Sequence, residues 1–116
     1  MRFENILRWI VLLIALVTVY LAASKIAYGE DKFEKDYNTE MLKLAGNYYC
    51  LACHNVEKKM VGPAWKDVAK RGDSIEVLTK SIIHGSQGKW GSMPMPPNRI
   101  TEMEAQELAI WIRSLK

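Results

Sequence analysis

The two cysteines of this chain lie three residues apart, and a histidine directly follows the second, in the segment Cys50-Leu51-Ala52-Cys53-His54. Two thiols at this spacing can form thioethers with the two vinyl groups of one haem, and the next imidazole can bind the iron from the same side. The segment therefore predicts one haem c, covalently attached through Cys50 and Cys53, with His54 as an iron ligand.

Three other interpretations of this segment are open. A structural zinc site would use Cys50, Cys53 and His54, but it needs a fourth ligand, and only His84 is available. A thioredoxin-like redox pair belongs in a βαβ context, which the sequence does not indicate. A plain disulfide is compatible with an oxidising compartment. Haem attachment is favoured, because the histidine occupies the position that this attachment requires.

The N-terminal segment, residues 1–28, is mostly apolar. Arg2 and Arg8 precede residues 9–23, which carry no charge. Basic residues ahead of an apolar stretch hold the N-terminus in the cytoplasm, so the rest of the chain is expected on the periplasmic or outer side of the inner (cytoplasmic) membrane.

Two fates of this segment are open. As a retained single-pass anchor, residues 6–28 would span roughly 34 Å at about 1.5 Å per residue, enough for a hydrocarbon core of about 30 Å. As a signal peptide, the segment would be cleaved at the small residues of 22–24 or 27–29. We favour the anchor, and both fates export the remainder.

The rest of the chain divides into an acidic linker, residues 29–40, and a domain, residues 41–116. The domain holds 11 basic and 7 acidic side chains. This modest positive charge suits an acidic protein partner and is too small and scattered to indicate nucleic-acid binding. A domain of this size buries little core, so an inserted apolar cofactor would help to stabilise it.

The sequence pattern predicts an all-α domain with long loops. The linker is expected to be a short, flexible connection of about ten residues that partly extends the first helix, and a helix over residues 39–46 then leads to Cys50. A short helix opens at Pro63, placed in its first turn, and ends at Arg71 before Gly72.

Two more helices have recognisable ends. Residues 75–84 form a helix that Asp73 or Ser74 caps and Gly85 stops. Residues 85–98, rich in glycine and proline, form a loop. A last helix follows Thr101, and Glu104 completes a capping box. These three to four short helices are expected to wrap around the haem.

The second axial ligand has to approach from the other face of the haem, and a distant loop is its natural source. Met93 and Met95 lie in Ser92-Met93-Pro94-Met95-Pro96-Pro97, where prolines stiffen the loop. Spacing alone does not decide between these two methionines. His84 is another candidate, although its position at a helix C-terminus has an ordinary electrostatic explanation.

Four segments and the C-terminal helix resemble the short, single-haem class I cytochromes c of bacteria. Besides the cysteine segment, they are Met60-Val61-Gly62-Pro63-Ala64, Gly85-Ser86-Gln87-Gly88-Lys89-Trp90-Gly91, Pro94-Met95-Pro96-Pro97-Asn98 and Glu104-Ala105-Gln106-Glu107-Leu108-Ala109-Ile110-Trp111. In the expected order, they cover essentially all of the exported domain. The resemblance implies the class I cytochrome c fold.

The resemblance also implies the axial ligands. His54 would be the proximal ligand and Met95, rather than Met93, the distal one. The backbone carbonyl of Pro63 would accept a hydrogen bond from the His54 ring and fix its orientation.

Two further residues gain roles from the resemblance. Trp90 would pack on the haem edge with its indole N–H toward a propionate, and Asn98 would steady the Met95 loop. The chain departs from its nearest relatives between Arg71 and His84, where it is about three residues shorter. It also has Ser81 where some members place an arginine near a propionate.

A six-coordinate His/Met haem has no open position, so the resemblance implies an electron carrier rather than an enzyme, with no small-molecule substrate. Its expected partners are a quinol–cytochrome c reductase and a terminal oxidase. They would dock on a basic rim for which the candidates are Lys58, Lys59, Lys89 and Arg99. Two alternatives are a haem sensor or enzyme with a labile or absent sixth ligand, and an interaction subunit of a respiratory complex.

Overall fold

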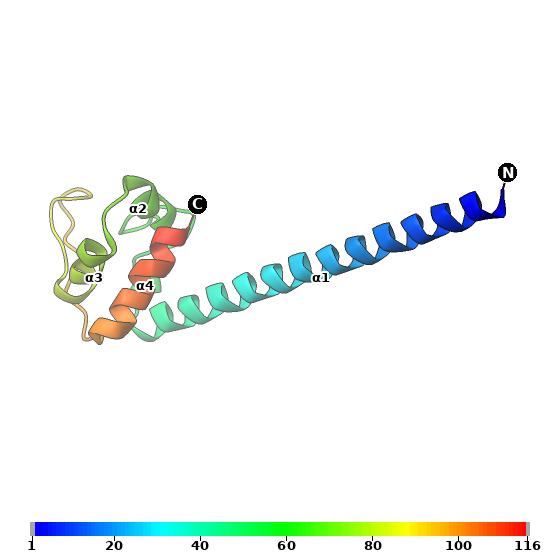
Figure 1. Ribbon diagram of the computed structural model, residues 1–116. Helices are drawn as coiled ribbons and strands as arrows, with labels where there is room; N and C mark the ends of the chain where they lie inside the picture. The colour runs from blue at the N-terminus through cyan, green and yellow to red at the C-terminus, as the bar shows by residue number, and fades with distance from the viewer. Residues whose placement is uncertain (1, 116) are drawn as a thin grey trace. The chain divides into compact units, whose positions relative to one another are not determined.

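The computed structural model describes residues 2–115 and is all-helical, as expected (Figure 1). Met1, the first residue of the predicted N-terminal segment, and Lys116, the last residue of the predicted domain, lie outside the described residues. The helices are α1 (Phe3–Asn47), α2 (Trp65–Arg71), α3 (Ile75–His84) and α4 (Glu102–Ser114), with a 3₁₀ turn, η1, at Cys50–Ala52. Within the described residues, one isolated β-bridge joins Ser86 to Met95 and no longer strand forms.

The chain forms two compact units, one up to Tyr37 and one from Asn38 onward. In the first unit, α1 exposes apolar side chains all around, and its most apolar 18-residue window has a mean hydropathy of 2.4. None of this window is buried in the structure. By length and composition this part of α1 suits a membrane span, and a signal sequence would have the same properties.

The prediction that residues 29–40 form a flexible connection is wrong. Residues 29–40 are helical and belong to α1, which does not begin anew near residue 39. Gly29 is the only glycine in the linker, and one glycine destabilises a helix by only about 1 kcal/mol. No proline interrupts the segment, and the rings of Phe33 and Tyr37, one helical turn apart, stack at 6.5 Å.

In the second unit, α4 supplies more of the buried apolar side chains than any other helix. It lies against α2 and α3 (Figure 1), and its inner face buries Ala105, Leu108, Ala109, Trp111 and Ile112. Ala105 and Ala109 are fully buried, and such small side chains let neighbouring elements approach closely. The indole Nε1 of Trp111 donates a hydrogen bond of 2.7 Å to Asn38 Oδ1, at the start of this unit.

The predicted helix ends are confirmed with one correction. Ser74 caps α3 and accepts a hydrogen bond from Val77 N, and Thr101 forms the capping box of α4 with Glu104. Pro63, however, is not in the first turn of α2. Ala64 is the extended N-cap (φ −60°, ψ 140°), so Pro63 lies one residue outside the helix, where its carbonyl contacts His54 instead.

The carboxylate of Glu104 is expected to make stability sensitive to acid. Hydrogen bonds from Thr101 and from Tyr48 Oη (2.8 Å) lower the pKa of Glu104 from its ordinary value. A lowered pKa in the folded state means stability that is present at neutral pH and is lost as the pH falls through that pKa. Glu104→Gln should therefore destabilise the protein at pH 7, and this difference should shrink in acid.

Guanidinium unfolding of the full-length haem protein in mild detergent, followed by haem absorbance from pH 7 to about pH 3, measures this effect. Glu107→Gln, an exposed position on the same helix, is the control and should keep the acid dependence of the unmodified protein. Parallel pH profiles for Glu104→Gln and the unmodified protein would contradict the prediction.

Candidate functional site

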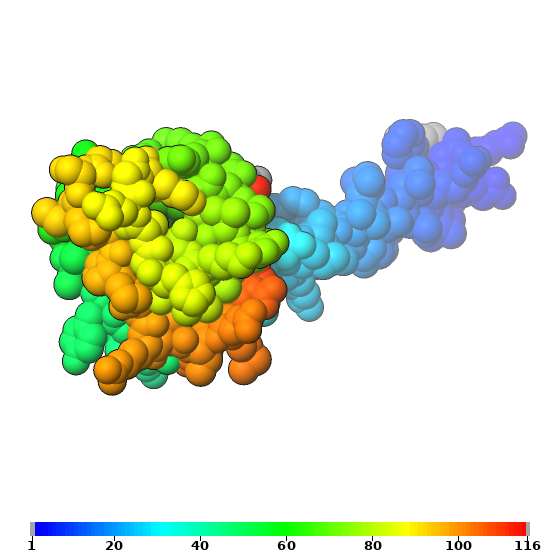
Figure 2. All heavy atoms as spheres, turned by 90° about the vertical axis from the view of Figure 1, so that its left-hand side faces the viewer, coloured from blue at the N-terminus to red at the C-terminus, as the bar shows by residue number. Residues whose placement is uncertain are grey.

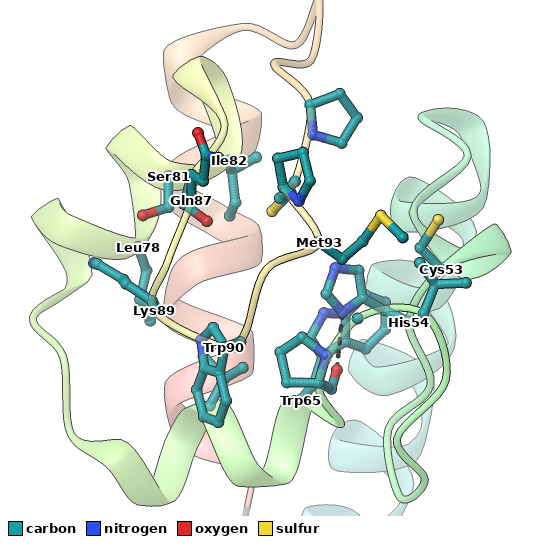
Figure 3. Close-up of a pocket in the computed structure, with 18 of the residues that line it drawn as sticks. Cys53, His54, Trp65, Leu78, Ser81, Ile82, Gln87, Lys89, Trp90 and Met93 are labelled. Carbon is teal, nitrogen blue, oxygen red and sulfur yellow. Dashed lines mark hydrogen bonds between the residues drawn. The ribbon is translucent and has the colours of Figure 1, made fainter.

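A mainly apolar cleft opens in the second unit between the Cys53–His54 segment, helices α2 and α3, and the loop that follows α3 (Figure 3). In Figure 2 this loop, in yellow to orange, forms part of the outer surface of the unit. The cleft holds about 910 Å³, solvent at its mouth included. A mainly apolar lining with a few polar groups is typical of sites that hold a ligand or cofactor.

The imidazole of His54 is held in one orientation. It is 9 % exposed, and its Nδ1 lies 2.9 Å from Pro63 O (dashed in Figure 3). A carbonyl oxygen only accepts hydrogen bonds, so Nδ1 carries the proton and Nε2 keeps its lone pair. On one side, the Trp65 ring stacks on the imidazole at 5.7 Å and 14°. The His54 side chain is thus prepared to bind a metal through Nε2.

Gly62 makes this orientation possible. A Cβ atom at this position would lie within 3.0 Å of three ring atoms of His54. Gly62 N also donates to Cys53 O (2.8 Å), and Trp65 N donates to Asn55 O (3.0 Å), which holds residues 53–55 against residues 62–65. Sequence reasoning gave no role to Gly62 or to Trp65, and the glycine beside Pro63 was the available signal of a close approach.

Both cysteines are free thiols. Cys50 begins η1 and Cys53 directly follows it as the C-cap, and Cys53 lines the cleft whereas Cys50 does not. Burial raises the pKa of the Cys50 thiol, and the preceding Tyr49 adopts a left-handed conformation (φ 58°). This backbone conformation, at the turn that starts the cysteine segment, costs about 1 kcal/mol or more of strain. The ring of Tyr49 is exposed.

The alternatives for the cysteine segment find no support in the described residues. Three His, Cys, Asp or Glu side chains that could hold one metal ion do not gather anywhere among residues 2–115. His84 is exposed and is not among the residues that line the cleft. The described chain has no βαβ unit, and the free thiols do not form a disulfide.

The loop after α3 brings both candidate methionines to the cleft. Met93 and Met95 line it, and Met93 is 66 % exposed whereas Met95 is half-buried. Met95 is fixed by its backbone, because Ser86 N donates to Met95 O (3.0 Å) and Met95 N donates to Ser86 O (2.8 Å). Gly85 permits this pairing, since its φ is 76° and a Cβ there would collide with Met95 O.

Asn98 ties the far end of the same loop to α3. Its Nδ2 donates to Ile82 O at 2.9 Å, and its backbone N donates to Ile83 O at 3.1 Å. Asn98 itself does not line the cleft, whereas Pro63, Trp90 and Ser81 do. Of the seven predicted cofactor-binding residues, five thus line the cleft, and Cys50 and Asn98 do not.

Comparison with known proteins assigns the family. A family profile described as cytochrome c oxidase, cbb3-type, subunit III matches residues 39–112. Cytochrome c-551 of Pseudomonas denitrificans is 52% identical over 71 residues, which cover 58% of this chain and 87% of the relative. The chain belongs to the class I cytochrome c family. Cytochrome c-552 of Hydrogenobacter thermophilus is 46% identical over 83 residues, 68% of this chain and 82% of the relative.

The solved structures agree with this assignment. The crystal structure of Nitrosomonas europaea cytochrome c552 superimposes with a TM-score of 0.62 at 45% identity and covers 65% of this chain and 99% of that one. This cytochrome c therefore carries one covalent haem c and transfers electrons, and it is not an enzyme. The described residues fit the haem, since the cleft is mainly apolar, two thiols are free and His54 Nε2 has a lone pair.

The close approach of Gly62 to His54 leads to a prediction for this cytochrome c. Gly62→Ala should force the imidazole to move and weaken its hydrogen bond to Pro63 O. Overpacking of this kind lowers the free energy of unfolding by about 1–3 kcal/mol. Guanidinium unfolding of the haem protein and the yield of covalently bound haem per chain measure the loss.

Gly46→Ala is the matched control. A Cβ at Gly46 would make an ordinary contact of 3.6 Å with Leu51 Cδ1, and alanine favours a helix over glycine by about 1 kcal/mol. This variant should be as stable as the unmodified protein or more so. If the two alanine variants lose the same stability and haem, the proposed role of Gly62 is incorrect.

Proposed function

We propose that this cytochrome c holds its haem through thioethers to Cys50 and Cys53, with His54 and Met95 as the axial iron ligands. The hydrogen bond from His54 Nδ1 to Pro63 O carries the proposal, because it leaves Nε2 free to bind iron. The bound haem supplies a one-electron ferric–ferrous couple.

Met95 is chosen over Met93 for a structural reason. Both backbone hydrogen bonds of Met95 anchor it to Ser86, and Asn98 ties the following turn to α3. A thioether is a weak ligand, so a fixed backbone reduces the entropy lost when the sulfur binds. Met93 has no such backbone pairing to Ser86 and is largely exposed.

The ligand pair and its surroundings suit electron transfer. Imidazole and thioether together close both axial positions, which leaves no place for a substrate. The soft sulfur favours ferrous iron, and apolar burial disfavours the extra charge of ferric iron, so both raise the reduction potential. Trp90 lines the cleft and would cover the haem edge.

For the rest of the chain, we propose a membrane anchor in residues 1–28 with its span at 6–28, a helical acidic linker in 29–40 and the haem domain in 41–116. The anchor would hold the domain on the periplasmic side of the inner membrane and near the membrane complexes of a respiratory chain. A quinol–cytochrome c reductase would be the electron donor and a terminal oxidase the acceptor. The apolar exposed surface of α1 supports the anchor.

The basic rim for docking would consist of Lys58, Lys59 and Arg99, which are exposed. Lys89, the fourth candidate, instead contacts Asp73 at 3.7 Å. Exposed charges of this kind mainly accelerate encounter with an acidic partner and are screened by salt.

A second arrangement is favoured by one observation, the name of the matching profile, which refers to an oxidase subunit. In that arrangement the chain would be a permanent subunit of an oxidase and would pass electrons within the complex. Size-exclusion chromatography of the membrane fraction in mild detergent distinguishes the two. Elution of the haem protein by itself supports a mobile carrier, and elution with oxidase activity supports a subunit.

The ligand assignment predicts opposite behaviour for two methionine variants. Met95→Ala should open the iron, so that carbon monoxide binds the ferrous protein rapidly and the reduction potential falls. Met93→Ala, the matched control two residues away, should remain closed to carbon monoxide. Absorbance spectra with and without carbon monoxide measure both. The reverse result would assign the ligand to Met93, and rapid binding by the unmodified protein would favour a haem sensor or enzyme.

The anchor makes a separate prediction. The intact mass of the protein from the membrane fraction should include residues 1–28 together with one haem, and alkaline carbonate should not release it. A mature protein that begins near residue 24 or 30 and lies in the soluble fraction would identify the segment as a cleaved signal peptide.

A further inference from the structure

Three charged side chains form a cluster beside the cleft, which we name the Arg71–Asp73–Lys89 cluster. Asp73 and Lys89 line the cleft, whereas Arg71 does not line it and is held next to it by these two residues and by Trp90. Arg71 Nε lies 3.6 Å from Asp73 Oδ1, and Lys89 Nζ lies 3.7 Å from Asp73 Oδ2. Arg71 Nη1 also donates to Lys89 O at 2.8 Å, and its Cζ lies 5.2 Å from the centroid of the Trp90 ring. One guanidinium thus joins the end of α2 to the loop that follows α3.

The cluster lies at a defined side of the cleft. Asp73, Lys89 and Trp90 line it together with the polar side chains of Ser81 and Gln87. Figure 3 places Ser81, Gln87, Lys89 and Trp90 across the cleft from Cys53 and His54. The vinyl groups and the propionates of a haem lie on opposite edges of the ring, so a haem attached at the cysteines would have its propionates on the polar side.

Stabilisation of the fold does not account for the cluster. Its two ion pairs are long, and the three side chains are 22–38 % exposed, so each pair contributes roughly 0–1 kcal/mol. Two cations facing one carboxylate leave a net charge of one positive unit. Arg71 uses Nε and Nη1, and a guanidinium has five N–H donors in a geometry that matches carboxylates.

The short connection between two helices brings Arg71 to this place. α2 ends at Arg71 and α3 begins at Ile75, so residues 72–74 make the whole turn. Gly72 adopts φ 83°, a left-handed conformation that lets the chain reverse at once. Arg71 and Asp73 then lie on either side of the glycine, and Ser74 caps α3.

We propose that the Arg71–Asp73–Lys89 cluster binds the haem propionates and that Arg71 supplies the guanidinium there, a role that Ser81 cannot take. This inference rests on the proposed attachment of the haem at Cys50 and Cys53. Asp73 aligns both cations, and its own negative charge limits how strongly they favour ferrous iron. The cluster therefore sets the reduction potential through two opposing contributions.

The test measures the midpoint potential of the full-length haem protein in mild detergent, at fixed pH and ionic strength. Arg71→Gln removes a positive charge near the haem and should lower the potential. Asp73→Asn removes a negative charge and should raise it. Lys70→Gln, next in sequence, is the matched control, because Lys70 is 72 % exposed and pairs with Asp67 on the surface. It should leave the potential nearly unchanged.

Two further variants separate charge from structure. Arg71→Lys keeps the charge and should retain most of the potential, even if Arg71→Gln folds poorly. Adding Ser81→Arg to Arg71→Gln should restore the potential, because it places a guanidinium on the same polar side of the cleft. Shifts of equal sign for Arg71→Gln and Asp73→Asn, or shifts no larger than that of Lys70→Gln, would overturn the inference.

Failure of this inference can be told from failure of the proposed function. If the unmodified protein lacks covalent haem or the sulfur-to-iron charge-transfer band of its ferric form, the proposed function itself is wrong. If haem and band are intact in every variant and the potentials do not move as expected, only the role of the cluster is refuted.

Discussion

The hydrogen bond between the His54 ring and the carbonyl of Pro63 is the interaction on which the site depends. It fixes the tautomer of the imidazole and so determines which nitrogen can bind a metal. Three neighbours maintain it: Gly62 leaves room for the ring, Trp65 stacks on it, and Ala64, directly after Pro63, is the N-cap of α2. A few adjacent residues thereby connect the backbone at a helix start to the ring nitrogen that we propose as the iron ligand.

The second unit combines a small core with a cleft. Its buried side chains come mainly from α4, α2 and α3, and they are few for a folded domain. A covalent porphyrin in the cleft would add apolar contacts on both faces and cross-link η1 to the domain. The cofactor is therefore expected to contribute to folding as well as to electron transfer.

The sequence predicted those parts of the fold whose signals are local. Ser74, Gly85 and the pair Thr101–Glu104 mark helix ends through contacts within one turn, and they lie where expected. The linker was misjudged because its charges suggested a solvated connection, whereas Glu and Lys side chains are good helix formers and the segment continues a helix that has already begun. The position of Pro63 was misjudged because a contact with His54, nine residues away, competes with the helix start.

For the site, the cysteine segment alone predicted a covalent haem, because the spacing of its two thiols matches the two vinyl groups of one haem. The Arg71–Asp73–Lys89 cluster could not be found in this way. Arg71 and Lys89 are 18 residues apart, and only the turn at Gly72 and the loop after α3 bring them together. Nor does spacing alone choose between Met93 and Met95, because the backbone pairing with Ser86 that distinguishes them is a tertiary feature.

The hydrogen bond between Trp111 and Asn38 limits where the domain can be separated from its N-terminal segment. The Trp111 side chain is 1 % exposed, so a protease or an engineered truncation that removes Asn38 leaves an indole N–H unpaired inside the core. An unsatisfied buried donor of this kind destabilises by about 1–3 kcal/mol. A soluble fragment that keeps this hydrogen bond therefore has to begin no later than Asn38, inside the long helix rather than at its end.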